Sequence, residues 1–386
     1  MDYELRTPAN PIFQRPQASS RLESMIVRIA ILWSHLSGYF SACLRALIDT
    51  QNVEFIIWDS CDSHHASFAG EIYSWMGQRR HPYQREADVG EIWETLCKFV
   101  PDALLVTSWY VPTYRKICRL FSGRCVRICC MDNQWLGTLR QFIGITVASR
   151  YIRPLYEGAF VPGKRQRSFA RMLGFTDAEI FEGLYSCDHP RYEEVYHKRT
   201  ASYQAPGSKF LFVGRLIKEK GIRLLADAYQ QYRSQVPDPW PLMIAGEGPL
   251  RSLLAEVEGV RFLGFVQPYQ LPSVFSQAGC VILPSAFEPW GVVVHEATSA
   301  GLAVICTARC GSSAHLVRDG KNGFILDDLD PAALAQLLKR YSMLSDAERM
   351  KLGEESIALS QEFTPTKWAN TVIRAVYNLK SNKGSA

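Results

Sequence analysis

Short runs of apolar residues alternate along this chain with longer stretches in which apolar positions recur at helical spacing. In the first half the apolar runs cover residues 25–33, 53–59, 102–109 and 125–132. Helical stretches over 41–50, 91–100 and 111–121 lie between them. Strands that are apolar on both faces are typical of a parallel sheet with helices on each side. Residues 25–190 are therefore predicted to form a doubly wound α/β domain.

The same alternation begins again in the second half. Its apolar runs are 209–214, 241–246, 260–266, 280–285, 302–307 and 323–326. Around residues 191–206 the pattern dissolves into polar residues, and we expect an interdomain linker there. A second Rossmann-like domain is predicted over 207–362 and a last helix over 363–382, which by pattern alone fits either domain. Two such domains would turn their binding loops toward a shared cleft.

Length and composition agree with this picture. A chain of 386 residues fits about two domains, and 47% hydrophobic with 21% charged residues is typical of soluble globular proteins. No apolar run is long enough to span a bilayer. Residues 1–24, rich in Pro, Gln and Ser, lack the apolar centre of a signal peptide. We therefore expect a loose N-terminal tail and a cytoplasmic protein.

The cysteines do not suggest a disulfide framework. There are 11 of them, an odd number, and no pair has the C-x2-C spacing of a zinc site. Most lie inside apolar runs such as "RCVRICCM" and "LAVICTARC". They are predicted to be buried thiols that act as small hydrophobic side chains.

The net charge of +5 is too small to indicate nucleic-acid binding. Its distribution is uneven, because the stretch from Arg150 to Arg171 has one acid, Glu157, among its basic residues. The basic residues are Arg150, Arg153, Lys164, Arg165, Arg167 and Arg171. Such a stretch binds anionic lipid headgroups or phosphorylated acceptors, or is simply a solvated face. Peripheral contact with the inner face of a membrane is one option that it leaves open.

The stretch "FVGRLIKEKGI" is the first candidate for chemistry. A strand is expected to end at Val213, where Gly214 lets the backbone turn, and Arg215 and Lys220 lie around the start of the next helix. Two cations beside a helix start favour a diphosphate, since free N–H groups and the helix dipole also attract anions. The alternative is a pair of solvated surface charges.

Two further strand ends repeat this design. "IAGEGPL" places Gly246 between a strand and a helix, and "FLGFV" ends a strand at Gly264 and continues to Val266. Exposed backbone groups at such ends can bind phosphates or the edge of a base. Each signal is weak alone, because single G-x-G patterns are common in α/β folds.

The stretch "SAFEPWGVVVHEATSAG" carries two carboxylates, Glu288 and Glu296. Pro289 is expected to begin a helix, and Glu288 lies just before it, where an acceptor for sugar hydroxyls is useful. Glu296 lies about 9 Å further along the helix, the span from a diphosphate to a ribose. A structural ion pair of Glu296 is the alternative. Free N–H groups are expected at the helix start, on Trp290, Gly291 and Val292.

Taken in order, these motifs resemble the C-terminal domain of family 4 retaining glycosyltransferases of the GT-B fold. The motifs are "GRLIKEKG", "IAGEGPL", "FLGFV", "PSAFEPWGVVVHEATSAGLAVI" and "VRDGKNGF". The resemblance covers about residues 207 to 380, and the motifs in this order are highly specific. It identifies Glu288 and Glu296 as an E-x7-E pair. It also implies that the last helix crosses back to the N-terminal domain.

The resemblance assigns a role to each candidate residue. Glu288 would bind hydroxyls of the donor sugar and Glu296 the nucleotide ribose. Arg215 and Lys220 would hold the diphosphate and stabilise its charge as it leaves. The base would lie against the backbone of Val266. The remaining donor-binding positions would be Gly38, Gly214, Gly246, Trp290, Gly291 and Val292.

The N-terminal half, the acceptor side, resembles the family more loosely. Gly38 in "LSGYF" is the best match to a Gly-Gly loop that many members have after the first strand. Asp132 and Asn133 follow a strand, where Asp132 would touch the acceptor or the donor's reacting carbon. His315 stands where a glutamate is common in the family.

The implied activity is transfer of a sugar, with retention of its anomeric configuration, from a nucleoside-diphosphate sugar to a hydroxyl group. The acceptor would be a glycan, a lipid-linked sugar or a small molecule. A UDP-sugar is favoured over a GDP-sugar as co-substrate, and no metal or other cofactor is implied. Catalysis would consist of positioning and charge stabilisation. A sugar-nucleotide epimerase and a non-catalytic nucleotide-sugar-binding protein are the alternatives.

Overall fold

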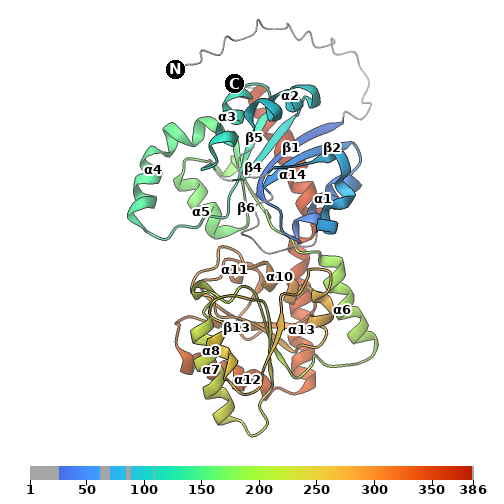
Figure 1. The fold of residues 1–386 in the computed structure, drawn as a ribbon, viewed down its shortest axis with the longest axis vertical. Coiled ribbons are helices and arrows are strands. Elements are labelled where there is room, and N and C mark those ends of the chain that lie inside the picture. The colour runs from blue at the N-terminus through green and yellow to red at the C-terminus, as the bar shows by residue number, and fades with distance from the viewer. Residues whose placement is uncertain (1–25, 61–69, 84–87, 108, 385–386) are drawn as a thin grey trace, which may run out of the picture.

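The computed structural model describes residues 26–60, 70–83, 88–107 and 109–384. The tail expected over 1–24 lies outside these residues. Two lobes are stacked along the long axis of the molecule, with the N-terminal half in one and residues of the C-terminal half in the other (Figure 1). Each lobe is built on one parallel sheet. This confirms the predicted α/β class with two Rossmann-like domains.

The first sheet has the strand order β3-β2-β1-β4-β5-β6-β7. Its strands are β1 (Val27–His35), β2 (Val53–Ser60), β3 (Arg80–Tyr83), β4 (Ala103–Thr107), β5 (Val126–Cys130), β6 (Gly158–Val161) and β7 (Ile180–Glu182). The four longest apolar strands lie where the sequence pattern predicted them. The pattern missed β3, β6 and β7, which have 4, 4 and 3 residues.

Helices cover both faces of this sheet. The helices are α1 (Phe40–Asp49), α2 (Val89–Phe99), α3 (Pro112–Leu120), α4 (Leu139–Tyr151) and α5 (Lys164–Met172), with the 3-10 turns η1 (Gly70–Arg79), η2 (Arg153–Leu155) and η3 (Asp177–Glu179). Ile29 and Ile31 of β1 pack on one face with α1, whereas Ala30 and Leu32 pack on the other with α2 and α3. A strand buried on both sides needs this continuous apolar sequence.

The second sheet has the order β10-β9-β8-β11-β12-β13. Its strands are β8 (Phe210–Val213), β9 (Leu242–Ala245), β10 (Val260–Gly264), β11 (Cys280–Leu283), β12 (Ala303–Thr307) and β13 (Gly323–Leu326), all six as predicted. Around it lie η4 (Lys218–Lys220), α7 (Ile222–Gln235), α8 (Ser252–Ala255), α9 (Leu271–Phe275), α10 (Val292–Ser299), α11 (Ser313–Leu316), α12 (Pro331–Ser342), α13 (Asp346–Ser360) and η5 (Gln361–Phe363).

Residues 191–206, which we expected to be a linker, are mostly helical instead. Helix α6 (His189–Ala201) packs on the second domain, where Tyr192 meets Phe275 edge to face at 5.2 Å. Arg199 donates to the carbonyl of Gly301 at 2.8 Å. This helix has many charged residues and few apolar ones, so its sequence shows no clear helical period of apolar positions. The crossover between the domains is therefore shorter and lies just before α6.

The last helix, α14 (Pro365–Gly384), returns to the first domain. Its Trp368 lies in the core beside Phe40 of α1 and donates from Nε1 to the carbonyl of Leu184 at 2.9 Å. Val376 and Leu379 belong to the same core, and Lys380 forms an ion pair with Asp102. Helix α14 runs along the inside of the upper lobe in Figure 1. The first domain is thus built from both ends of the chain.

The described cysteines are free thiols, and all of them except Cys97 are buried. This agrees with the expectation that they act as small hydrophobic side chains. Cys61 lies outside the described residues.

Candidate functional site

Three glycines line the carboxyl edge of the second sheet. Gly214 and Gly246 both have φ of 152°, a conformation that side-chain-bearing residues rarely adopt. A Cβ on Gly246 would overlap the carbonyl oxygen of Gly214. The amide of Gly246 donates to the carbonyl of Gly264 at 2.8 Å, which joins the ends of β9 and β10. With no side chains in the way, a ligand can approach the backbone closely at this edge.

Arg215 and Lys220 follow β8, but their surroundings differ. Lys220 ends the turn η4, and its Nζ donates a hydrogen bond to the carboxylate of Glu288. Arg215 is exposed, and within the described part of the chain its side chain forms no ion pair. Lys220 is thus held in place by a carboxylate, whereas Arg215 projects its charge into solvent.

The loop before α10 is fixed by backbone contacts with the 310–312 segment. The carbonyls of Glu288 and Trp290 accept from the amides of Gly311 and Ser312 at 3.0 and 2.9 Å. Gly291 has φ of 88°, and a Cβ there would lie 2.8 Å from Cys310 Sγ. This left-handed residue precedes the helix, which begins at Val292.

The prediction that Pro289 begins the helix was therefore wrong. Gly291 turns the chain after the proline, so the helix starts three residues later. The amides of Trp290, Gly291 and Val292 remain close to this start, as the sequence suggested. In the described residues none of these three amides donates a hydrogen bond to protein. They are available to an anion at the helix N-terminus.

Glu296 lies in the second turn of α10 and is partly buried. Burial raises the pKa of its carboxyl from 4.5 to about 7, against the lowering effect of a hydrogen bond with the Tyr192 hydroxyl. Among the described residues Glu296 has no ion-pair partner. The described residues therefore contain no structural ion pair of Glu296, which was the alternative that the sequence left open. A carboxylate in such surroundings gains from a polar ligand that donates hydrogen bonds.

His295, next to Glu296, was not identified from the sequence. Its Nδ1 accepts from the amide of Cys187 at 3.1 Å, and its Nε2 lies 3.1 Å from the carbonyl of Ser360. Burial lowers the pKa of His295 to about 3, so the ring is neutral. Cys187 and Ser360 lie next to the two crossovers between the domains. His295 therefore ties helix α10 to both of them.

Asp132 follows β5 in the first domain and faces the second domain. The Tyr185 hydroxyl donates to Asp132 at 3.2 Å, and the Tyr39 ring meets that of Tyr185 edge to face at 5.7 Å. Burial raises the pKa of Asp132, and the negative charge of Glu288 raises it further. Asp132 and Glu288, predicted separately, are thus brought together. The two tyrosines beside them carry no sequence signal of their own.

The start of α5 also reaches the second domain. Gln166 donates from Nε2 to the carbonyl of Pro289, and Arg165 donates from Nη2 to that of Ala308, both at 2.5 Å. The amide of Lys164 donates to His315 Nε2 at 3.0 Å. His315, which stands where a glutamate is common in the family, therefore forms part of the domain junction. Burial lowers its pKa, which suits an acceptor nitrogen.

Most of the other basic residues in the 150–171 stretch are neutralised. Arg153 pairs with Glu179 at 2.9 Å, and Arg171 pairs with Asp177 at 2.6 Å. Arg167 pairs with Asp177 at 3.0 Å. The stretch is therefore not one continuous positive surface, although Arg150 remains exposed at the end of α4.

Unpaired polar atoms gather around the loop that carries Glu288. Ser285 Oγ, Trp290 Nε1 and Gln166 Oε1 are buried without a hydrogen-bond partner in the described structure. Buried polar atoms are normally satisfied by protein, water or ligand. Three such atoms in one region are expected where a polar ligand or ordered water binds.

Gly38 and Val266 lie at the junction on either side. A Cβ on Gly38 would overlap the ring of Pro268, so the loop after β1 touches the loop after β10. The Val266 side chain packs on the second-domain core. Its backbone therefore remains the part that can meet a ligand. The binding roles given to Gly38 and Val266 remain predictions.

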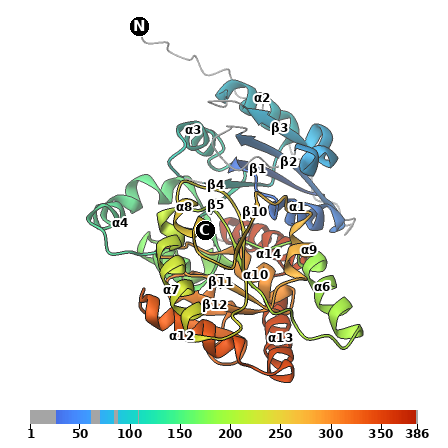
Figure 2. The same cartoon turned by 60° about the horizontal axis from the view of Figure 1, so that its bottom comes forward.

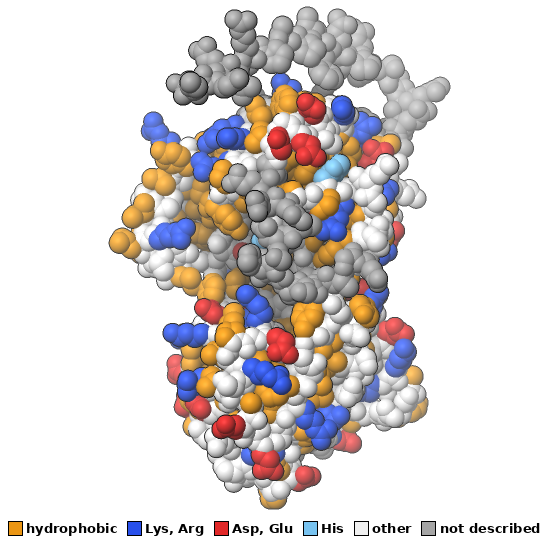
Figure 3. Space-filling model, in the orientation of Figure 1, with side chains coloured by type: hydrophobic (Ala, Val, Ile, Leu, Met, Phe, Trp, Pro, Cys, Tyr) orange, Lys and Arg blue, Asp and Glu red, His pale blue; other side chains and the backbone are white. Residues whose placement is uncertain are grey.

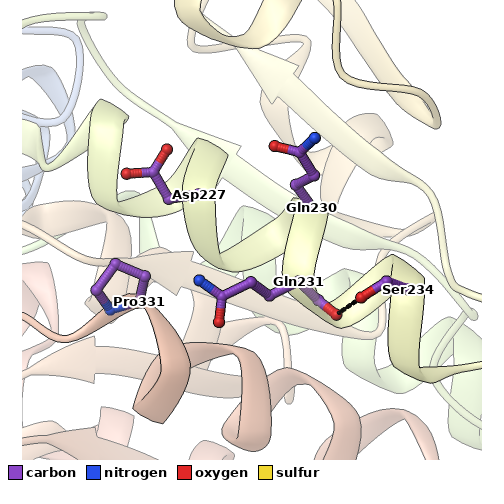
Figure 4. Close-up of a pocket in the computed structure, with 5 residues that line it drawn as sticks. All are labelled: Asp227, Gln230, Gln231, Ser234 and Pro331. Atoms are coloured by element: carbon purple, nitrogen blue, oxygen red, sulfur yellow. Dashed lines mark hydrogen bonds between the residues drawn. The ribbon is translucent and has the colours of Figure 1, made fainter.

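Two surface depressions lie away from these residues. One, of about 500 Å³, is lined by Asp227, Gln230, Gln231 and Ser234 of α7 and by Pro331 (Figure 4). The other, of about 660 Å³, lies between α6 and α9. In the described residues no group of three or more His, Cys, Asp or Glu side chains is placed to hold a metal ion. No described helix is long and apolar enough to cross a membrane.

Comparison with known proteins shows similarity to glycosyltransferases. Residues 204–359 match the family model described as glycosyl transferases group 1. The spore coat protein SA of Bacillus subtilis is 26% identical over 279 residues, 68% of each chain. A D-inositol 3-phosphate glycosyltransferase of Corynebacterium urealyticum is 33% identical over 179 residues, which cover 43% of this chain and 41% of that enzyme. The family model thus covers the second domain, and the match to the spore coat protein extends over more of the chain than that domain.

A solved structure shares the whole fold. Anabaena Alr3699/HepE, crystallised with UDP and glucose, aligns with a TM-score of 0.67 at 16% identity, over 91% of this chain and 99% of that one. At this identity the likeness shows the GT-B fold. Together with the family match, the comparisons support a glycosyltransferase.

Proposed function

We propose that this protein is a family 4 retaining glycosyltransferase that uses a nucleoside-diphosphate sugar, with UDP favoured as the nucleotide. The observation that carries the proposal is the ion pair of Lys220 with the buried Glu288, opposite Asp132 of the other domain. A cation and two carboxylates at one domain junction support a site for a diphosphate and a sugar. That HepE was crystallised with UDP supports the choice of nucleotide.

The donor would extend along α10. Arg215, Lys220 and the amides at the helix start would bind the diphosphate through charge-assisted hydrogen bonds. Glu296 would accept hydrogen bonds from the ribose hydroxyls, and the backbone of Val266 would meet the base. Glu288 would orient the sugar near Asp132. The backbone at Gly214 and Gly246 would pass close to the phosphates.

In the reaction the bond between the anomeric carbon and the diphosphate oxygen breaks. The acceptor oxygen forms its bond to the same face of that carbon, and its proton passes to the departing phosphate. No protein nucleophile or metal ion is required in this scheme. Catalysis then rests on orientation and on the positive charges that stabilise the leaving diphosphate.

We place the reaction in the cytoplasm, with a carbohydrate or a lipid-linked sugar as the acceptor and no role for nucleic acid. The sequence suggested membrane contact through the Arg150–Arg171 stretch. The ion pairs of Arg153, Arg167 and Arg171 weaken that particular proposal, because a charge that is already paired attracts a lipid headgroup less.

A thermal-shift screen over UDP, GDP, ADP and TDP, each with its glucose conjugate, tests donor binding. A ligand at 100 times its dissociation constant stabilises the folded state by about 2.7 kcal/mol, so a specific nucleotide should stand out. No shift with any of them would contradict the proposal.

Turnover separates the alternatives. With the donor and no acceptor, a transferase hydrolyses the donor slowly at most, whereas an epimerase interconverts sugar nucleotides. Release of the nucleoside diphosphate that depends on an added acceptor supports the transferase. Nucleotide binding without turnover on any acceptor would favour a non-catalytic binding protein.

A further inference from the structure

Helix α4 has its apolar side on the outside of the molecule. Its exposed residues include Leu139, Phe142, Ile143 and Val147, with exposed fractions of 76, 51, 58 and 40%. Leu136 in the loop before the helix and Tyr151 at its end are also exposed. The single fully buried residue of this helix is Ala148. A surface helix of a globular protein normally has the opposite arrangement.

The exposed apolar residues form one continuous face. Relative to Leu139, residues Phe142, Ile143 and Val147 stand at i+3, i+4 and i+8, the spacing of one helical side. Both views of the fold show α4 at the outer edge of the first domain, away from the second sheet (Figures 1 and 2). Figure 3 shows hydrophobic side chains gathered at this edge, with basic side chains among them. An exposed patch of this kind marks an interaction surface.

The charged residues in the segment that carries this face have one sign. Residues 133–156 contain no Asp or Glu, and they contain Arg140, Arg150 and Arg153. Arg140 and Arg150 are exposed on α4 itself, and neither forms an ion pair within the described chain. An exposed apolar helix face with basic residues at its borders is the pattern of a helix that lies in a membrane interface.

We propose that α4 docks on the surface of an anionic lipid bilayer. Leu139, Phe142, Ile143 and Val147 would enter the boundary between headgroups and acyl chains, and Arg140 and Arg150 would bind the headgroup phosphates. A second copy of this chain fits the face less well. In a symmetric contact the same arginines would approach each other with no acid in the segment to compensate.

This location bears on the acceptor, in an inference that rests on the proposed function. Asp132 lies seven residues before the start of α4, so the two are at most about 25 Å apart along the chain. A docked α4 would hold the acceptor side of the site close to the bilayer. The acceptor class that fits is a sugar or hydroxyl group carried on a membrane lipid.

Co-sedimentation of the full-length protein with vesicles tests the surface. We expect binding to vesicles of phosphatidylglycerol and phosphatidylcholine, weaker binding in 0.5 M salt (roughly a 4 Å screening length) and little binding to phosphatidylcholine alone. The double variant Phe142→Ser/Ile143→Ser should lose at least tenfold in vesicle affinity. Arg140→Gln/Arg150→Gln should lose the preference for anionic lipid.

Met343→Ser is the matched control, since Met343 is 70% exposed at the end of α12 in the other domain. It should bind vesicles as the wild type does. The shift caused by UDP should be unchanged in every variant. The melting temperature should fall slightly only in Phe142→Ser/Ile143→Ser, which loses the edge-to-face contact of Phe142 with Trp135 at 4.8 Å.

The proposal is overturned if the wild type binds neither kind of vesicle, or if Phe142→Ser/Ile143→Ser binds as well as the wild type. A dimer in solution that this variant dissolves, without vesicle binding, would make the face a subunit contact instead. Vesicle binding without any nucleotide-induced shift would refute the proposed function and leave the membrane surface in place.

Discussion

Lys220 donates a hydrogen bond to Glu288 across two loops of the second sheet. The cation assigned to the diphosphate and the acid assigned to the sugar therefore hold each other in position. The exposed fractions of the two side chains are 20 and 10%, so water screens this pair little. The roles of the two residues are coupled, and their variants must be interpreted together.

Lys220→Ala should weaken both nucleotide binding and folding. It removes a charge-assisted contact to the diphosphate, worth about 1.5–3 kcal/mol, and it leaves the carboxylate of Glu288 without its partner. We expect at least a tenfold loss in affinity for the nucleoside diphosphate by calorimetry and a lower melting temperature. Lys218→Ala, an exposed residue in the same turn, is the control and should change neither.

Arg215→Ala should weaken nucleotide binding without weakening folding. Arg215 is exposed and has no ion pair in the described structure, so folding should be unaffected while nucleotide affinity falls about tenfold. Unchanged affinity in this variant would remove Arg215 from the diphosphate site.

Glu288→Gln and Glu296→Gln should fail in different ways. Glu296 is proposed to bind the ribose, so its variant should bind the bare nucleoside diphosphate several-fold more weakly. Glu288 is proposed to orient the sugar, so its variant should keep most of that affinity and lose turnover by about 10²-fold. Equal losses of nucleotide affinity in the two folded variants would contradict this division.

The raised pKa of Glu296 predicts an unusual stability profile. Between pH 4.5 and about 7 the folded protein holds a proton that the unfolded chain has released. The contribution of Glu296 to stability is therefore greatest below pH 4.5 and is lost as the pH rises through 7. Glu296→Gln should consequently be more stable than the wild type at pH 8, by up to about 3 kcal/mol.

Denaturant unfolding at pH 5 and pH 8 measures this difference, which should grow with pH. Nucleotide binding by the wild type should strengthen as Glu296 ionises between pH 6 and 8, and in Glu296→Gln this increase should be absent. A variant less stable than the wild type at pH 8 would assign Glu296 a structural role.

Gly38→Ala tests the contact between the domains. The new Cβ would overlap the ring of Pro268, so the loops after β1 and β10 must separate. We expect turnover to fall about tenfold or more, with little change in nucleotide affinity, because the diphosphate contacts lie in the second domain alone. A simultaneous loss of nucleotide affinity would instead place Gly38 against the donor. Gly144→Ala in α4, where the added atom meets no neighbour and φ is not positive, controls for glycine replacement as such.

The sequence pattern predicted the second domain more completely than the first. The strands of the second sheet are apolar runs in which Arg261 of β10 is the one charged residue, whereas β3 reads Arg-His-Pro-Tyr and lies at the edge of the first sheet. An edge strand with polar residues has no period that separates it from a loop. Helix α6 was not predicted for a related reason. Its buried apolar residues are only Tyr192 and Val195, too few to show a helical period.

The candidate site shows the same limit. Four of the candidate residues belong to one domain and to motifs with fixed spacing, so they could be assigned to one site from the sequence. They are Arg215, Lys220, Glu288 and Glu296. Tyr39, Tyr185 and Gln166 come from the first domain and meet the second only through tertiary packing. No motif in the sequence around these three residues indicates a function. Their position at the domain junction is seen only in the three-dimensional structure.

The return of α14 to the first domain affects the order in which the protein can be made. Phe40, Leu44 and Leu47 of α1 are synthesised early, but their core is completed by Trp368, Val372 and Val376 near the other end of the chain. The second sheet is complete as soon as Leu326 has left the ribosome. Once α12 and α13 have followed, the second domain can therefore fold during translation, while the core of the first stays incomplete until α14 has been made.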